Sequence, residues 1–380
     1  MITFYSRLLH IKNPKALHTV QAFSFGHVCY NVVMESQVLY RKYRPSEWNE
    51  VVGQEHIVSA LSQSIESGTF SHAYLFTGSR GTGKTSVARI FARALGTNPE
   101  DIIEIDAASN RQVADVDEIR QSVRVLPFSS RFKVYIIDEV HMLSSHAFNA
   151  LLKTIEEPPA HVIFVLATTE LDKVPDTILS RCQVFSFRKP NEKVLASIIE
   201  SIAEREHVVI DKESAALVAF LGDGSFRDSF SILQKVLSAA KGRVITRELI
   251  ESITGAPSLQ VIHELYTALI ECDMDAIYTT LARAEAHHTD MMLLAQLFLD
   301  TMRRSLMYRY APNKRADIEA EYSEQYMEII KRGAVESTEA ISSRGIVAVI
   351  TAIERIAYAA VPTLALELAF IDMLGIEGKK

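Results

Sequence analysis

Two kinds of hydrophobic pattern follow one another along this chain of 380 residues. Apolar runs at residues 73–76, 133–137 and 162–167 have the length and composition of buried parallel strands. Residues 86–95 have the period of a helix, and a glycine-rich turn joins them to the first strand. We therefore predict an α/β domain with a parallel sheet over residues 37–190.

The helical period dominates from residue 191 onward. Asn191 follows a proline and suits the N-cap of a helix over residues 191–204. We predict a small helical lid over residues 191–254 and an all-α domain over residues 255–380. Further helices are expected at residues 214–221, 228–239, 261–272, 274–287, 291–310, 322–331 and 345–359.

The first 36 residues differ from the rest, because no Asp or Glu occurs before Glu35. We expect translation to start at Met34, which makes residues 1–36 a non-native or disordered extension. A targeting peptide is the alternative, but the segment lacks the sustained apolar core of a secretory signal.

The turn after the first strand matches the pattern G-x-x-x-x-G-K-[ST], which is typical of nucleoside triphosphate sites. In such a loop glycines turn backbone N–H groups towards phosphate oxygens, and the positive end of the following helix favours the anion. Lys84 is predicted to reach the β- and γ-phosphates, and Thr85 to coordinate Mg²⁺. The predicted loop residues are Gly78, Ser79, Arg80, Gly81, Thr82, Gly83, Lys84, Thr85 and Ser86.

Two carboxylates follow the second strand, and they indicate hydrolysis as well as binding. Ligands of parallel α/β sheets collect at the carboxyl ends of the strands. Asp138 is predicted to hold Mg²⁺ through its water shell, and Glu139 to polarise the attacking water. The third strand should lie beside the Asp138 strand and end in Thr168, whose hydroxyl is expected to face the γ-phosphate. Two arginines in short polar contexts, Arg181 and Arg227, are candidates to stabilise charge on that phosphoryl group.

These strings together resemble the AAA+ ATPase subunits of DNA sliding-clamp loaders, and most closely the short form of the bacterial DNA polymerase III gamma/tau family. The resemblance spans about residues 38–375 and includes the motifs LYRKYRP, VGQEH, EIDAASN, IDEVHML, FNALLKTIEEPP and LSRC. It implies an AAA+ P-loop ATPase core followed by the lid and a helical collar. A monomeric helical bundle is the alternative to the collar.

The resemblance also implies roles for single residues. Thr168 corresponds to the sensor-1 position, Arg227 to the sensor-2 arginine, and Arg181 to an arginine finger that reaches a neighbouring subunit's nucleotide. A surface salt bridge is the alternative for Arg181, and a helix N-terminal contact for Arg227. The segment that packs around adenine corresponds to Tyr43, Arg44, Pro45, Val51 and Val52, with a local hydrophobic staple as the alternative.

One departure from the family pattern concerns zinc. The family usually carries a four-cysteine module before the segment that corresponds to Glu104, Ile105 and Asp106, but only residues 96–103 fill that position here. The three cysteines of the chain, Cys29, Cys182 and Cys272, are scattered. Because a structural zinc site needs four close ligands, we predict none. The same cysteine count favours a reducing compartment.

Net charge and composition limit the classes of partner that the chain can have. The net charge of −7 argues against broad coating of nucleic acid, so a DNA contact should be local. Arg111, Arg120 and Arg124 are candidates to hold the DNA backbone, and a solvated helix face is an equally good interpretation of them. No apolar run is long enough to span a membrane. We expect a cytoplasmic, nucleoid-associated bacterial protein.

The sequence thus predicts an ATP- and Mg²⁺-dependent motor subunit that acts with other clamp-loader subunits in a pentameric ring. The expected partners are a sliding clamp and primed-template DNA. No three-carboxylate polymerase site is found, so nucleotide transfer is not expected. One alternative is an AAA+ branch-migration or repair helicase, and another is a non-hydrolysing structural subunit. The chain stops soon after the collar pattern, as in the short form of the family.

Overall fold

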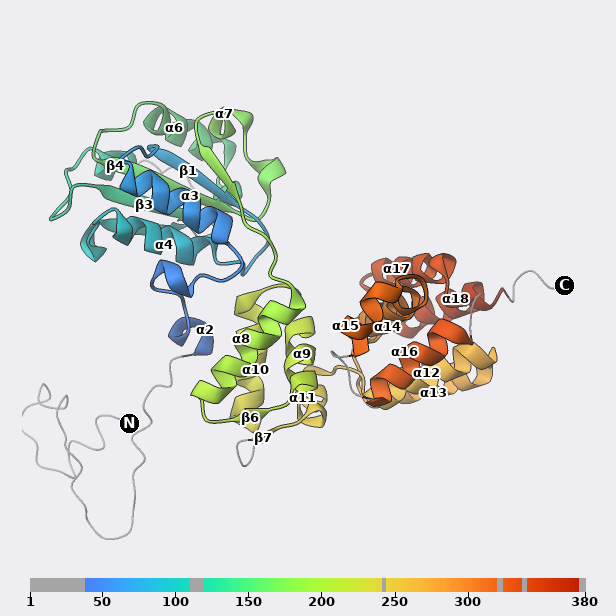
Figure 1. The fold of residues 1–380 in the computed structure, drawn as a ribbon. Helices are drawn as coiled ribbons and strands as arrows, with labels where there is room; N and C mark the ends of the chain where they lie inside the picture. The colour runs from blue at the N-terminus through green and yellow to red at the C-terminus, as the bar shows by residue number, and fades with distance from the viewer. Residues whose placement is uncertain (1–37, 110–118, 241–243, 320–323, 337–339, 376–380) are drawn as a thin grey trace, which may run out of the picture. The chain divides into compact units, whose positions relative to one another are not determined.

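The computed structural model describes residues 38–109, 119–240, 244–319, 324–336 and 340–375 (Figure 1). The predicted extension over residues 1–36 lies outside the described residues, and so does Arg111. None of the helices in these ranges is long and apolar enough to cross a membrane.

A five-stranded parallel sheet forms the first part of the described chain, as predicted. The strand order is β2-β3-β4-β1-β5, which places β4 between β1 and β3. The prediction that the third strand lies beside the Asp138 strand is therefore confirmed. The strands are β1 (Ala73–Thr77), β2 (Ile102–Asp106), β3 (Lys133–Asp138), β4 (Val162–Thr168) and β5 (Gln183–Ser186).

Helices cover both faces of the sheet (Figure 1). On one face, apolar side chains of α3 (Glu55–Glu66) and α4 (Lys84–Ala94) pack on the strands. On the other, α6 (Ser145–Glu156) and α7 (Asp176–Leu179) do so. Both clusters consist of buried apolar side chains, as expected for a sheet with near-continuous apolar strands. Short elements join these layers: α2 (Leu39–Lys42), η2 (Trp48–Glu50), η3 (Pro99–Asp101), η4 (Val140–Met142) and η5 (Leu171–Lys173).

Four helices and a two-stranded parallel sheet follow. Asn191 caps the first of these helices, because its side chain accepts a hydrogen bond from the N–H of Val194, and this prediction is confirmed. The elements are α8 (Glu192–Arg205), β6 (Val209–Ile210), α9 (Lys212–Leu221), α10 (Phe226–Ala239), β7 (Val244–Ile245) and α11 (Arg247–Thr254). α2 also packs on α10, with the N–H of Leu39 donating to Gln234 Oε1 at 3.0 Å.

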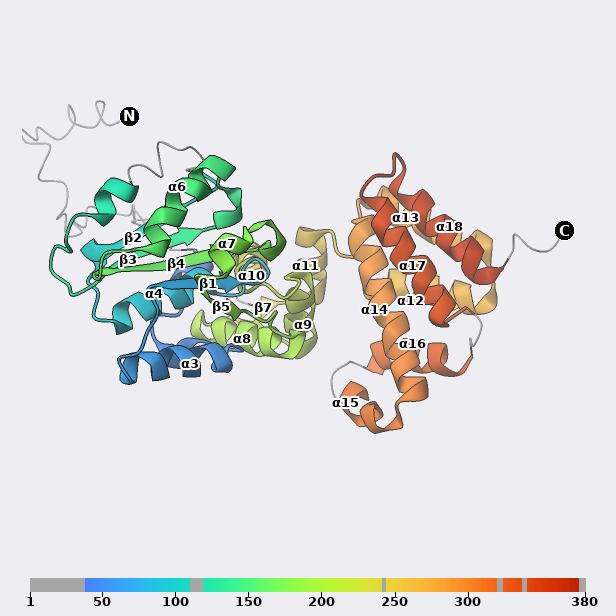
Figure 2. The same ribbon diagram turned by 90° about the horizontal axis from the view of Figure 1, so that it is seen from above.

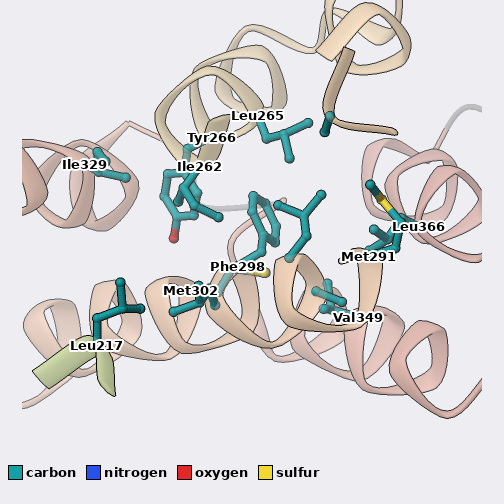
Figure 3. Packing of buried hydrophobic residues seen from close by; sticks show 14 of the residues in the cluster. Leu217, Ile262, Leu265, Tyr266, Met291, Phe298, Met302, Ile329, Val349 and Leu366 are labelled. Atoms are coloured by element: carbon teal, nitrogen blue, oxygen red, sulfur yellow. The ribbon is translucent and has the colours of Figure 1, made fainter. Parts of the chain in front are cut away.

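The remaining described chain is helical (Figure 2). Its longest helix, α14, contacts α12, α16, α17 and α18. Figure 3 shows Phe298 of α14 between Leu265 and Tyr266 on one side and Val349 on the other. The helices are α12 (Leu259–Glu271), α13 (Met274–Ala286), α14 (Met291–Tyr310), η6 (Pro312–Lys314), α15 (Arg315–Glu319), α16 (Glu324–Val335), α17 (Ser343–Ile356) and α18 (Pro362–Leu374).

Candidate functional site

The loop between β1 and α4 has the backbone shape that a phosphate needs. Gly83 caps α4 with φ of 99°, a left-handed conformation that other residues rarely adopt. Gly81 has φ of 73°, and a Cβ atom there would collide with the side chain of Ser225. Thr82 closes the loop, since its hydroxyl donates to the carbonyl of Ser79 at 2.9 Å. The sequence pattern and the backbone therefore agree on an anion-binding loop.

Lys84 is buried at the base of this loop. Its ammonium group donates to the carbonyl oxygens of Gly78 at 2.7 Å and Ser79 at 2.9 Å. Burial lowers the pKa of Lys84 below its ordinary value, and the carboxylates of Glu139 and Asp138 act in the opposite direction. Because no described carboxylate forms an ion pair with the ammonium, its charge remains available for an anion in the loop.

Asp138 and Thr85 come from different elements and meet directly. The Thr85 hydroxyl donates to Asp138 Oδ2 at 2.7 Å. Asp138 Oδ1 accepts the N–H of Glu139 at 3.0 Å, which fixes the carboxylate. A hydroxyl beside a carboxylate is an oxygen pair of the kind that Mg²⁺ uses, directly or through water. The residues present therefore fit a magnesium ion next to the loop.

Glu139 follows β3 in a left-handed backbone conformation, with φ of 50°. Its Oε2 atom accepts hydrogen bonds from the Thr169 hydroxyl at 2.9 Å and the Thr169 N–H at 3.2 Å. No described residue donates to its other oxygen, Oε1. A non-glycine residue in this backbone region is strained, and such strain clusters at functional sites.

The hydroxyl of the adjacent Thr168 is held by neighbouring groups, and its sensor-1 role stays a prediction. Its hydroxyl donates to the carbonyl of Glu170 at 3.1 Å and contacts His141 Nδ1 at 3.0 Å. It is fully buried, so the hydroxyl that lies against Glu139 belongs to Thr169 instead. Sequence reasoning missed both Thr169 and His141.

The alternation of side chains along the strands explains the difference. On β4, Phe164 and Leu166 pack on the α6 face, whereas Val165 and Ala167 pack on the α4 face. Continued alternation sends Thr168 to the α6 face and Thr169 to the face that carries the phosphate loop. The same count on β3 sends Asp138 to the α4 face, where it meets Thr85. The alternation of side chains along each strand could therefore have predicted from the sequence that Thr169, and not Thr168, lies on the face of the phosphate loop.

A helix of the lid region touches the phosphate loop. Ser225 caps α10 and lies against Gly81, and the N–H of Phe226 donates to the Gly81 carbonyl at 3.1 Å. Arg227 is in the first turn of α10, one residue from this contact, with its guanidinium 5.3 Å from the centre of the Tyr40 ring. Arg227 therefore belongs to the loop's surroundings, and its sensor role stays a prediction.

Residues of the predicted adenine segment contact two different helices, α8 and α4. The Tyr43 hydroxyl donates to Glu206 at 2.5 Å, so this ring is tied to the end of α8. Arg44 instead donates to the Ser86 hydroxyl at 2.9 Å. Burial lowers the pKa of Arg44, with the nearby positive charge of Arg89 adding to the effect. Arg44 thus lies beside the first turn of α4. Contact of Tyr43, Arg44, Pro45, Val51 and Val52 with a base stays a prediction, with Val51 half-buried and Val52 exposed.

Arg181 lies beyond α7 and forms a salt bridge with Glu156 at 2.7 Å. It also donates to the Thr177 carbonyl at 2.7 Å and the Ser180 hydroxyl at 3.0 Å. None of these partners belongs to the phosphate loop. The surface ion pair proposed as the alternative is present, and the finger role stays a prediction.

Other predicted residues are less informative. Arg124 is exposed just after a helical segment at residues 119–123, and Arg120 is half-buried within it. Their contact with DNA, like that of Arg111, stays a prediction.

The cysteines within the described ranges give no sign of a metal site. Burial raises the pKa of the Cys182 thiol to about 11. The described ranges contain no group of three or more His, Cys, Asp or Glu side chains that could hold a metal, while Cys29 lies outside them. The expectation that zinc is absent stays a prediction.

Comparison with known proteins places the chain in a family. Residues 53–108 and 96–191 match the family described as DNA polymerase III, delta subunit. DNA polymerase III subunit tau of Bacillus subtilis is 41% identical over 300 residues, which cover 73% of this chain and 53% of that protein. DNA polymerase III subunit gamma of Buchnera aphidicola subsp. Baizongia pistaciae is 40% identical over 63% of this chain and 70% of that protein.

The chain spans about half the length of the tau relatives that it matches. Among solved structures, the Thermotoga maritima RuvB Holliday junction branch migration motor matches with 23% identity and a TM-score of 0.49, over 63% of this chain and 85% of that one. A likeness at that level says nothing about function. The sequence relatives and the phosphate loop together show that this chain belongs to the DNA polymerase III gamma/tau subunit family.

Proposed function

We propose that this chain is the ATP-hydrolysing AAA+ motor subunit of a clamp loader, which opens a sliding clamp and places it on primed DNA. The observation that carries the proposal is the meeting of three strand ends at one edge of the sheet. There the phosphate loop lies beside the bonded pair of Thr85 and Asp138, with Glu139 next to them. Nucleotide-hydrolysing sites require this combination.

The residues of the site divide the work between binding and chemistry. The N–H groups of the loop and the ammonium of Lys84 would hold the phosphates, and Thr85 and Asp138 would hold the metal. Mg²⁺, when bound, supplies positive charge next to the terminal phosphates. Glu139 would orient and deprotonate the attacking water through its Oε1 atom, to which no described residue donates. The intact Lys84 and Glu139 argue against the non-hydrolysing alternative.

Arg181 supports a site shared between subunits. Its guanidinium is bonded to Glu156 and Thr177, and it is partly exposed at the end of α7. An arginine held this way at a surface is suited to complete a neighbouring subunit's site, as arginine fingers do. We therefore propose that the chain acts with sister subunits in a ring of five. Family membership favours this function over a branch-migration helicase.

The clamp and primed-template DNA are the proposed partners, with Arg120 and Arg124 as candidate contacts to the DNA backbone. Nucleotide binding would assemble the open complex, and hydrolysis would release it. Backbone contacts without base contacts would make DNA binding salt-dependent and independent of sequence.

The test is steady-state ATP hydrolysis by the chain with its sister subunits, with and without clamp plus primed-template DNA. We expect stimulation by clamp and DNA. Arg181→Ala should remove about 10³- to 10⁵-fold of the rate, the range measured for arginine fingers in GTPases. Arg93→Ala, on the exposed last turn of α4, is the matched control and should leave the rate unchanged. A rate indifferent to clamp, DNA and Arg181 would refute the proposal.

A further inference from the structure

His141 lies beside the catalytic carboxylate and has no assigned role. It is the second residue of η4, the short helix that begins directly after Glu139. Its side chain is 5% exposed. Nδ1 lies 3.0 Å from the Thr168 hydroxyl and 3.5 Å from Glu139 Oε2, and Nε2 lies 3.2 Å from Glu170 Oε1. One imidazole ring therefore connects three strand-end residues.

The other hydrogen bonds of Thr168 determine whether its hydroxyl or His141 Nδ1 is the donor in their contact. A hydroxyl has one hydrogen, and Thr168 gives it to the Glu170 carbonyl at 3.1 Å. Its oxygen then accepts from the Glu170 N–H at 3.0 Å and from His141 Nδ1. Nδ1 is therefore a donor, and it is this N–H edge that lies next to Glu139 Oε2.

Glu139 needs such restraint more than most residues do. Its φ of 50° is a conformation that a residue with a Cβ atom adopts only when its surroundings impose it. Thr169 holds Oε2 with two hydrogen bonds, and the Nδ1 edge of His141 approaches the same oxygen from another element. Anchoring one carboxylate oxygen fixes the direction of the other.

Glu170 holds the ring from its outer side. Its Oε1 lies 3.2 Å from His141 Nε2, and its Oε2 forms an ion pair with Lys173 at 2.8 Å. Glu170 is about half exposed, so this side of the network faces solvent. The two ring nitrogens thus have separate tasks, one towards the catalytic carboxylate and the other towards the surface.

We propose that His141 is a positioning residue that aims Glu139 Oε1 at the attacking water through its Nδ1 edge. The proposal rests on the hydrolytic function proposed above. In that step water oxygen bonds to the terminal phosphorus, the bond from phosphorus to the β-phosphate oxygen breaks, and Glu139 Oε1 takes the water's proton. His141 touches none of the reacting atoms, so its effect should appear in turnover and not in nucleotide binding.

Two amide variants separate the tasks of the ring. In His141→Asn the amide nitrogen occupies the position of Nδ1, so the contacts with Thr168 and Glu139 remain. In His141→Gln the amide nitrogen occupies the position of Nε2, so only the contact with Glu170 remains. We expect His141→Ala and His141→Gln to lower kcat about 10- to 100-fold, the cost of a slightly misplaced catalytic group, with KM unchanged. His141→Asn should retain most of the wild-type kcat.

The assay uses the full chain with its sister subunits, clamp and primed DNA, with ATP as the substrate. His161→Asn is the matched control, because that half-buried ring bonds the Val123 carbonyl at the opposite end of β4. A wild-type kcat in His141→Ala would overturn the proposal, and so would equal kcat values for the Asn and Gln variants. Glu139→Gln in the same assay identifies the source of a failure: if that variant hydrolyses ATP normally, the proposed function itself is wrong.

Discussion

The phosphate-loop edge of the sheet and the helical region from residue 255 onward treat polar side chains differently. At the sheet edge, side chains from β3, β4 and α4 bond one another, and the backbone of Glu139 is strained. In the helical region, Tyr266 bonds Ser305 at 2.9 Å and Thr301 bonds Tyr326 at 2.7 Å inside an apolar core. The first arrangement prepares charged groups for a ligand, and the second removes neutral groups from water.

Tyr326 in the helical core and Lys84 at the sheet edge illustrate this difference. Burial raises the pKa of Tyr326 to about 12, so its hydroxyl stays neutral and serves only as a hydrogen-bond partner. Lys84, by contrast, is buried with its ammonium group directed at backbone carbonyls that an anion can replace. A polar group in the helical core should therefore matter for stability, and one at the sheet edge for turnover.

Replacing Lys84 should have a large effect on both turnover and ATP affinity. Lys84→Ala removes the charged donor for the terminal phosphates, so turnover should fall about 10²- to 10³-fold, as when one preorganised donor is lost. ATP affinity should fall as well, while the thermal midpoint without nucleotide changes little. Hydrolysis rates and calorimetric titration with ATP check this. Retention of both affinity and rate would contradict the assignment of the loop.

The opposite result is expected in the helical core. Phe298 is 1% exposed and packs on Tyr266 and Phe370, with ring centres 5.3 and 5.2 Å away. Phe298→Ala should lower the free energy of unfolding by about 3–5 kcal/mol, because it leaves a cavity. Tyr358→Ala, whose ring is 91% exposed, should change it by less than about 0.5 kcal/mol. Urea unfolding of the isolated chain measures both, and similar losses would contradict the described core.

Most helices from residue 191 onward could be predicted because their sequences carry a clear helical period. Residues 291–310 were predicted and observed with the same ends, and α8, α10 and α13 differ from the prediction by at most two residues. α18 was missed because it is apolar almost all round, which hides the period. The strands β2 and β5 were missed because they are the two outermost strands of the sheet and contain exposed and polar residues.

The candidate site was harder to predict than the fold. The phosphate loop, Asp138 and Glu139 are local patterns, and the structure brings all of them together. The choice between Thr168 and Thr169 depended on which face of β4 each side chain occupies. His141 gave no pattern, because its partners are distant in sequence and only the strand order brings them close.

The two threonines provide a prediction of intermediate size. Thr169→Val removes the hydroxyl that holds Glu139, so kcat should fall roughly 10- to 150-fold, because one charged hydrogen bond is worth roughly 1.5–3 kcal/mol. Thr168→Val leaves buried donors without an acceptor and should cost about 1–3 kcal/mol of folding free energy. Parallel kinetic and unfolding measurements test this division. A larger turnover loss in Thr168→Val would reverse the assignment.

The smallest effect is expected at the tether between α2 and α8. Burial would raise the pKa of Glu206, but hydrogen bonds from Lys42 and Tyr43 outweigh it, so the pKa is lowered. A lowered carboxyl pKa stabilises the fold above its unfolded value of about 4.3 and loses that contribution as pH falls through the folded value. Tyr43→Phe should therefore cost about 0.5–1.5 kcal/mol at neutral pH and almost nothing at low pH. Urea unfolding against pH checks this, and a pH-independent cost would contradict it.

The central claim is that Glu139 performs hydrolysis at a site that Lys84 and the loop build for ATP. The most direct measurement is ATP binding and single-turnover hydrolysis by Glu139→Gln in the assembled complex. The account predicts wild-type affinity and a rate lower by about 10²- to 10⁴-fold, the usual contribution of a general base. Hydrolysis at the wild-type rate would contradict it.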